Sequence, residues 1–140
     1  MKNKICVFDF ETDGKDPYTC SPVQLACVMV DPEKLEIIPD SEFNINLKPE
    51  LLDKNPDHEY EIDLLEFHAK AQKTTATEVL NSWKNFPSQK QSWGQFINYL
   101  DKYHTRSSRK SVFSAPIASG YNILRFDIPI VDRVAAKYKN

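Results

Sequence analysis

Residues 5–14 read ICVFDFETDG, and this stretch decides the fold that the sequence predicts. Its almost continuous apolar run predicts a strand over Lys4–Glu11 that lies in the centre of a sheet and is covered on both faces. Asp13-Gly14 then predicts the turn that ends the strand. The chain is therefore expected to begin on a central strand that carries two acidic residues near its end.

Asp9 and Glu11 are those two acidic residues. Positions two apart on a strand point to the same face, so both carboxylates are predicted to project together. Two acids on one face of a buried strand are costly unless a cation or a hydrogen-bond donor compensates them, and Mg²⁺ is the usual partner of such oxygen ligands. A bare Asp-x-Glu is nevertheless common, and alone it is better explained by a loop aspartate and a solvated glutamate.

The rest of the pattern predicts further strands and helices. Strands are predicted over Val23–Val30, Leu35–Leu47 and Val112–Tyr121, helices over Glu59–Gln72, Thr75–Phe86, Ser92–Tyr103 and Phe126–Lys139, and loops over Lys48–His58 and His104–Ser111. Thr75 and Ser92 each precede Glu or Gln by three residues, which marks a helix start. Three strands joined by short turns and a fourth reached through helices predict an α/β fold with a mixed sheet, three strands antiparallel and the fourth parallel.

The charge balance argues against one common way of binding nucleic acid. Lys and Arg number 18 and Asp and Glu number 20, so the net charge of −2 does not favour binding mainly by phosphate neutralisation. An enzyme that grips a polyanion through bound divalent cations remains compatible with this charge. Cys6 and Cys27 lie in apolar runs, which predicts buried free thiols, a reducing compartment and a cytoplasmic protein. No stretch approaches the length of a membrane span.

A third acidic residue, Asp127, lies at the predicted junction of the fourth strand and the last helix. Residues 120–129 around it read GYNILRFDIP. Taken alone, Asp127 is better explained as the N-cap of the helix, Asn122 as a turn former and Pro129 as a first-turn proline. What changes this interpretation is the combination with residues 5–14.

Two motifs in this order resemble a known nuclease family. Residues 7–14, VFDFETDG, resemble the first exonuclease motif of the DEDD (DnaQ-like) superfamily. Residues 120–129 resemble its second motif, N-x-x-x-F-D, in a form also close to the proofreading domains of B-family DNA polymerases. The resemblance implies a ribonuclease H-like fold and a two-metal-ion 3′–5′ exonuclease. Such an enzyme hydrolyses phosphodiester bonds of single-stranded or 3′-terminal nucleic acid, with DNA favoured over RNA.

The same resemblance implies roles for individual residues. Asp9 would bridge two Mg²⁺ (or Mn²⁺) ions, Glu11 would bind the first ion and Asp127 would hold the second. Two ions about 3.5–4 Å apart activate a water and stabilise the leaving oxygen of an in-line displacement, which explains the need for clustered acids. The candidate substrate-binding residues are Thr12, Asn122 and Phe126 by the resemblance, and Arg125 by its place beside the site.

The third motif of the family, with a His or Tyr and a final metal-binding Asp, has no counterpart after Asp127. Residues 128–140 alone follow, and Asp132 lies on the same predicted helix. His58, His68 and His104 all precede the second motif and are expected to be ordinary surface or half-buried side chains. We therefore expect residues 1–140 to form one exonuclease-like domain truncated before the third motif, with a longer chain or a partner subunit supplying the remainder.

Two other functions are compatible with part of the pattern. A haloacid-dehalogenase-type phosphatase also carries an acidic motif, D-x-D-x-T, at the end of its first strand. Glu11 stands where that chemistry requires the second Asp, however, and residues 120–127 have no role in it. A non-catalytic nucleic-acid-binding module on a degenerate exonuclease fold is the other alternative, and three intact acids argue against it.

Overall fold

A four-stranded sheet with the order β3-β2-β1-β6 forms the centre of the computed structural model, which describes residues 3–106, 113–114 and 116–138. The strands are β1 (Ile5–Thr12), β2 (Pro22–Val30), β3 (Phe43–Asn46) and β6 (Ile117–Ser119). β2 is antiparallel to both β1 and β3, whereas β6 runs parallel to β1. The predicted ribonuclease H-like mixed sheet, with three antiparallel strands and a parallel fourth, is confirmed.

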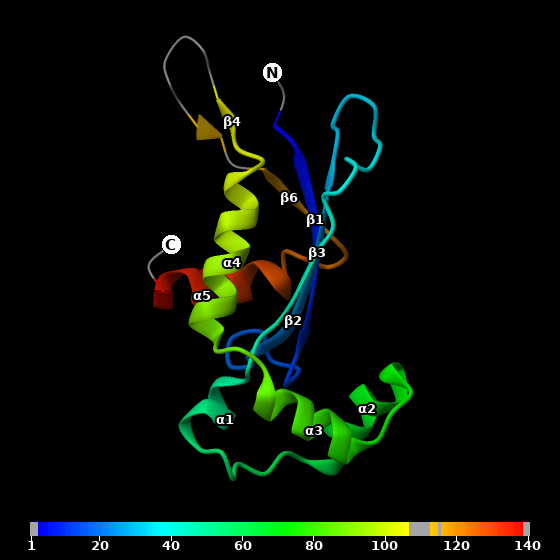
Figure 1. Cartoon of the computed structure of the whole chain (residues 1–140), viewed down its shortest axis with the longest axis vertical. Helices are drawn as coiled ribbons and strands as arrows, with labels where there is room; N and C mark the ends of the chain where they lie inside the picture. The colour runs from blue at the N-terminus through cyan, green and yellow to red at the C-terminus, as the bar shows by residue number, and fades with distance from the viewer. Residues whose placement is uncertain (1–2, 107–112, 115, 139–140) are drawn as a thin grey trace.

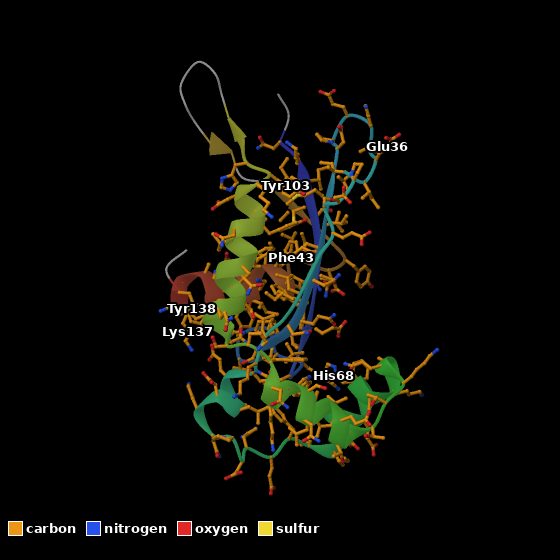
Figure 2. All side chains as sticks on the ribbon, viewed as in Figure 1. Glu36, Phe43, His68, Tyr103, Lys137 and Tyr138 are labelled. Carbon is orange, nitrogen blue, oxygen red and sulfur yellow. The ribbon has the colours of Figure 1, made fainter. Side chains whose placement is uncertain are left out.

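Two helices cover one face of this sheet, and three gather at its end (Figure 1). α4 (Gln89–Asp101) and α5 (Asp127–Tyr138) lie against the face, where β1 and β2 contribute the opposing side chains. Phe43 of β3, labelled in Figure 2, stacks on Tyr99 of α4 with ring centroids 4.7 Å apart. The buried core between sheet and helices includes Phe8, Phe10, Leu25, Met29, Trp93, Phe96, Ile130 and Val134.

A second buried cluster lies among the helices at the end of the sheet. It is formed by α1 (Glu50–Lys54), α2 (Ile62–Gln72) and α3 (Ala76–Asn85). Trp83 is 1% exposed at its centre and packs with the side chains Val23, Leu52, Leu65, Ala69 and Val79. Because β2 supplies Val23, this helical cluster is anchored to the sheet.

β1 alternates between buried and open positions, which corrects the expectation that both of its faces are covered. Phe8 and Phe10 are buried beneath the helices, whereas Asp9 and Glu11 on the opposite face are exposed. The apolar run is therefore explained by one deeply buried face together with half-buried Ile5 and Val7. The acidic pair faces away from the core, as the period of the strand requires.

Several element boundaries differ from the sequence prediction. β3 is shorter than the predicted Leu35–Leu47 strand, because Leu35 and Asp40 have φ angles of 56° and 60° and the backbone turns there. The predicted loop over Lys48–His58 contains the single turn of α1. The predicted fourth strand is interrupted at Pro116, with β5 (Phe113–Ser114) before it and β6 after it.

The two predicted helix starts have different outcomes. Thr75 caps α3 by accepting a hydrogen bond from the Glu78 amide at 3.2 Å, as predicted. α4 begins at Gln89, three residues before the predicted Ser92, because Ser88 caps it by accepting from the Gln91 amide. Ser92 instead lies inside the helix, and its hydroxyl donates to the Asn46 carbonyl of β3 at 2.6 Å.

The helix after the second motif and the small ribbon before it complete the described elements. α5 matches the predicted Phe126–Lys139 helix, with Pro129 in its first turn. β4 (Thr105–Arg106) pairs with β5 across the predicted basic loop, of which residues 107–111 lie outside the described residues.

Cys6, Cys20 and Cys27 are buried free thiols. No helix of the described residues is long and apolar enough to cross a membrane.

Candidate active site

The edge of β1 that faces β6 brings Asp127 to the acidic strand. β6 pairs with Ile5–Val7, so beyond Val7 no strand of the described residues lies along this edge of β1, while the opposite edge pairs with β2. The Phe10 amide uses this edge to donate to the Asp127 carboxylate at 3.2 Å. A side chain 117 residues away in sequence thus satisfies a buried strand amide and is placed alongside the acidic pair.

A close backbone approach at Gly120 makes this placement possible. A Cβ added to Gly120 would lie 2.6 Å from the Phe8 carbonyl oxygen and 2.5 Å from the Ile123 side chain. Only a residue without a side chain allows the end of β6 to lie this close to β1. The glycine therefore sets the path of the loop that leads into α5 and to Asp127.

The loop between β6 and α5 carries the substrate-binding candidates of the second motif. Asn122 has a φ of 54°, and its carbonyl accepts hydrogen bonds from the Arg125 and Phe126 amides. Its predicted role as a turn former is confirmed. Asn122 and Arg125 are exposed, whereas Phe126 is half-buried and packs against the core. Their proposed contacts with a substrate stay predictions.

Neighbouring carboxylates affect the ionisation of Glu11 and Asp127. The pKa of Asp127 is raised to about 6, mainly by burial and also by the nearby Asp9 and Glu11, while the Phe10 amide opposes the rise. Burial also raises the pKa of Glu11, with a second contribution from Asp9. Asp127 is 2% exposed, in contrast to the open Asp9 and Glu11. The structure thus brings together the three acids that the sequence singled out.

A shallow hollow of about 570 Å³ lies on the open face of the sheet beside Asp9. Its lining includes Asp9, Val28, Asn44, Gly120 and Tyr121. Tyr121 is 96% exposed at the rim, which the sequence did not single out. The hollow has a mostly apolar lining with two carboxylates, Asp9 and Glu42, and it lies next to the loop of the second motif.

Thr12, the remaining substrate-binding candidate, is buried and takes part in two contacts at the end of β1. Its hydroxyl donates to the Gly14 carbonyl at 2.6 Å, and its own carbonyl lies 2.8 Å from His68 Nε2. His68 is 4% exposed, so the expectation of a surface or half-buried histidine is wrong. The error has a physical reason: α2 turns this polar residue toward the Trp83 cluster, which local sequence does not reveal.

Asp13 was predicted only as a turn residue, and in the structure it ties the turn to the helical cluster. Its carboxylate accepts from the Tyr60 hydroxyl and from the Ser21 amide, both at 2.6 Å. Burial raises the pKa of Tyr60, and the hydrogen bond to Asp13 raises it further. Asp13 is 7% exposed and therefore supports the turn after Glu11. No local sequence signal links Tyr60 to this position.

The donor chemistry of the three acids fits a divalent cation. Asp9, Glu11 and Asp127 offer oxygen ligands, which Mg²⁺ prefers, and the charges of Asp9 and Glu11 disfavour the ionisation of Asp127 until a cation compensates them. In the arrangement described, however, Asp127 directs an oxygen to the Phe10 amide. Among residues 3–106, 113–114 and 116–138, no three His, Cys, Asp or Glu side chains form a group that could hold a metal ion.

Comparison with known proteins gives matches at the level of structure. Neither a protein-family model nor a curated protein matches the sequence. The ExoI/SSB-Ct complex matches with a TM-score of 0.65 at 15% identity, over 99% of this chain and 25% of that chain. The chain shares the fold of exonuclease I. Escherichia coli exonuclease I in complex with a dT13 oligonucleotide gives a TM-score of 0.64 at 15% identity, over 98% of this chain and 24% of that one.

The likeness to exonuclease I covers nearly all of the chain but a limited part of that enzyme. A further structure, described as suggesting how processivity is achieved, has a TM-score of 0.64 at 16% identity, over 98% of this chain. The chain spans about a quarter of the length of the exonuclease I chains that it matches.

Proposed function

We propose that the chain is the acidic-site portion of a divalent-metal-dependent 3′–5′ exonuclease that acts on single-stranded DNA. The observation that carries this proposal is the place of Asp127 beside the acidic strand: its carboxylate accepts from the Phe10 amide, between Asp9 and Glu11 in sequence, and both of these acids raise its pKa. The fold shared with exonuclease I supports it independently. The oligonucleotide complexes of that enzyme, with dT13 and dA16, are the reason for proposing single-stranded DNA as the substrate.

The three carboxylates would hold divalent cations in this function. When bound, such cations supply an activated water and stabilise the leaving oxygen of a phosphodiester. Asp9 and Glu11 would act from the open face, where both side chains are exposed, and Asp127 from the buried edge. Because the pKa of Asp127 is about 6 without metal, a fraction of its carboxyl groups stays protonated at slightly acidic to neutral pH until a cation favours the charged form.

The substrate would lie across the open face of the sheet. The hollow beside Asp9 ends at Tyr121, and the exposed Asn122 and Arg125 follow directly in the same loop. Arg125 would contact a phosphate, and the Tyr121 ring offers a stacking surface for a base. We expect any further ligand and the proton-transfer residue of the reaction to come from a continuation of the chain or from a partner subunit.

The experiment that tests this function is digestion of single-stranded DNA and RNA labelled at the 3′ or 5′ end. The chain is incubated with Mg²⁺ or Mn²⁺, with a chelator control. We expect metal-dependent shortening from the 3′ end, and Asp9→Ala should lower its rate at least about a hundredfold, because the site would lose charge stabilisation in the transition state. Glu33→Gln, which removes an exposed carboxylate in the β2–β3 turn, is the matched control and should keep the rate.

Three outcomes would contradict the proposal. Shortening that Asp9→Ala leaves undiminished would show that the acidic cluster does not carry the reaction. Binding of a dT oligonucleotide without shortening, equally strong with and without metal, would favour a non-catalytic nucleic-acid-binding module. Release of phosphate from small phosphate esters would favour the phosphatase alternative instead.

A further inference from the structure

A buried histidine, His68 of α2, contacts the end of the acidic strand. Its Nε2 atom lies 2.8 Å from the carbonyl oxygen of Thr12, which directly follows Glu11. A carbonyl oxygen can only accept, so Nε2 carries the proton and donates. His68 is 4% exposed and therefore too enclosed to reach a substrate itself. Figure 2 shows His68 where the helices at the end of the molecule meet the sheet.

The His68 ring is held in place by aromatic neighbours. Trp83 meets it edge to face, with centroids 5.1 Å apart and an interplanar angle of 77°. The Phe67 ring approaches at 5.6 Å with an angle of 84°. A polar ring in this apolar setting is costly unless its hydrogen bond is made. The contact with Thr12 is thus a fixed feature of the packing.

The Thr12 carbonyl belongs to the same edge of β1 as the Phe10 amide. Residues two apart on a strand direct their backbone groups to the same side. The Asp13 amide donates to the Ser21 carbonyl, so the odd-numbered positions direct their backbone groups toward β2. Phe10 and Thr12 therefore face away from β2, beyond the end of β6. Asp127 satisfies the first of these groups and His68 the second. Glu11 lies between them.

His68 contacts the backbone that directly follows Glu11, because its Nε2 atom donates to the Thr12 carbonyl. The regular pairing of β1 with β2 shifts register between Glu11 and Thr12, so the ladder alone does not hold this end of the strand.

We propose that His68 is a positioning residue for the acidic cluster, which holds the end of β1 through Thr12 and thereby fixes Glu11 beside Asp9 and Asp127. This inference rests on the proposed nuclease function and adds a residue outside both sequence motifs. It makes the α2–α3 helices part of the site, because Trp83 of α3 packs against the His68 ring and that ring holds the end of β1. Residues of this supporting kind typically contribute about 10–100-fold to metal affinity or activity.

The test compares three variants of the whole chain with the unaltered chain and with Asp9→Ala, which tests the acidic site itself. His68→Phe fills the space but cannot donate to Thr12, whereas His68→Gln places an amide donor at a similar reach. Leu65→Ala is the matched control, because Leu65 is 6% exposed on the same face of α2 and belongs to the Trp83 cluster. It should destabilise the helical cluster without removing the bond to Thr12. Mn²⁺ affinity is measured for each variant by electron paramagnetic resonance, with urea unfolding in parallel.

We expect His68→Phe to weaken Mn²⁺ binding by roughly 10–100-fold. His68→Gln should recover most of this affinity. Leu65→Ala should be less stable but should keep its Mn²⁺ affinity. In metal-free samples, the amide signals of Glu11 and Thr12 should shift or broaden in His68→Phe and return in His68→Gln. This pattern separates a positioning role from a general loss of stability.

The outcomes that refute the role of His68 are distinct from those that refute the proposed nuclease function. If Asp9→Ala weakens Mn²⁺ binding but His68→Phe does not, the acidic site stands and the role of His68 is refuted. If Leu65→Ala loses Mn²⁺ as His68→Phe does, the histidine contributes stability alone and the inference fails. If Asp9→Ala binds Mn²⁺ as well as the unaltered chain, the proposed function fails, and the positioning role fails with it.

Discussion

Asp127 is a carboxylate whose surroundings favour the neutral acid. Its pKa lies near 6 because of burial, with the Asp9 and Glu11 charges adding to the effect, against an ordinary value of 3.8. The folded chain therefore keeps a proton over a pH range in which the unfolded chain has lost it. By linkage, stability in the absence of metal falls as pH rises from about 4 to about 6 and then levels off. The burial of Glu11 contributes with the same sign.

Asp127→Asn tests this effect at the scale of one residue. The amide oxygen of asparagine can still accept from the Phe10 amide, but the side chain carries no charge. In chelator-containing buffer at pH 8, the variant should be more stable than the unaltered chain, by up to about 3 kcal/mol. Urea unfolding at pH 4.5 and pH 8 measures the difference. Equal stability of the two proteins at pH 8 would contradict the assignment of the raised pKa.

The residues of the site differ in how far the sequence predicts them. Asp9 and Glu11 follow from strand periodicity, because i and i+2 share a face whatever surrounds the strand. Asp127 needed the combined pattern of two motifs. His68 and Tyr60 could not be predicted, since they reach the end of β1 through contacts 56 and 47 residues apart in sequence. Such contacts depend on how α2 and the loop before it pack against the sheet.

At the scale of elements, the junction of β6 with α5 depends on one glycine. Gly120 lies against the Phe8 carbonyl of β1, and any side chain there would force the two strands apart. The turn at Asn122 and the start of α5 follow directly from this position. Gly94 is the natural comparison, because it lies inside α4 and a Cβ there would meet nothing within 4 Å.

Alanine at these two glycines should therefore have opposite effects. Gly120→Ala should lower the free energy of unfolding by about 1–3 kcal/mol, because backbone atoms cannot yield without displacing β6. It should also weaken the Phe10–Asp127 hydrogen bond and any metal binding. Gly94→Ala should raise stability by about 0.5–1 kcal/mol, since it removes a flexible residue from a helix interior. Urea unfolding of both variants measures these changes. A Gly120→Ala variant as stable as the unaltered chain would contradict the close approach of Gly120 to the Phe8 carbonyl.

The sequence predicted the type of most elements but not all of their limits. Local capping chemistry was sufficient at Thr75, whereas at Ser92 the same pattern was misleading, because Ser88 offered an equally good cap one turn earlier. Packing decides between the two serines. The Ser92 hydroxyl faces β3 and donates to the Asn46 carbonyl, so Ser92 lies inside the helix and does not cap it. α1 escaped prediction because a five-residue helix with one buried side chain, Leu52, has no periodicity to detect.

The whole described molecule consists of two buried clusters joined near the proposed site. The sheet core contains Trp93, and the helical cluster contains Trp83. Two hydrogen bonds at the end of β1 connect them, from His68 to Thr12 and from Tyr60 to Asp13. A third connection is the buried Gln89 amide, which donates to the Pro22 and Lys48 carbonyls. We infer that the clusters unfold as one cooperative unit.

Each tryptophan can report on its own cluster, which makes this inference testable. Trp93→Phe leaves the Trp83 signal, and Trp83→Phe leaves the Trp93 signal. In each variant, the urea midpoint from fluorescence should coincide with that from circular dichroism, because neither cluster is stable without the other. Tyr60→Phe, which removes the bond to the Asp13 carboxylate, should lower the midpoint of both probes together, at a cost of about 1.5–3 kcal/mol. A Trp83 signal lost at lower urea than the circular dichroism signal would instead mean that the helices detach first, leaving Glu11 without its support.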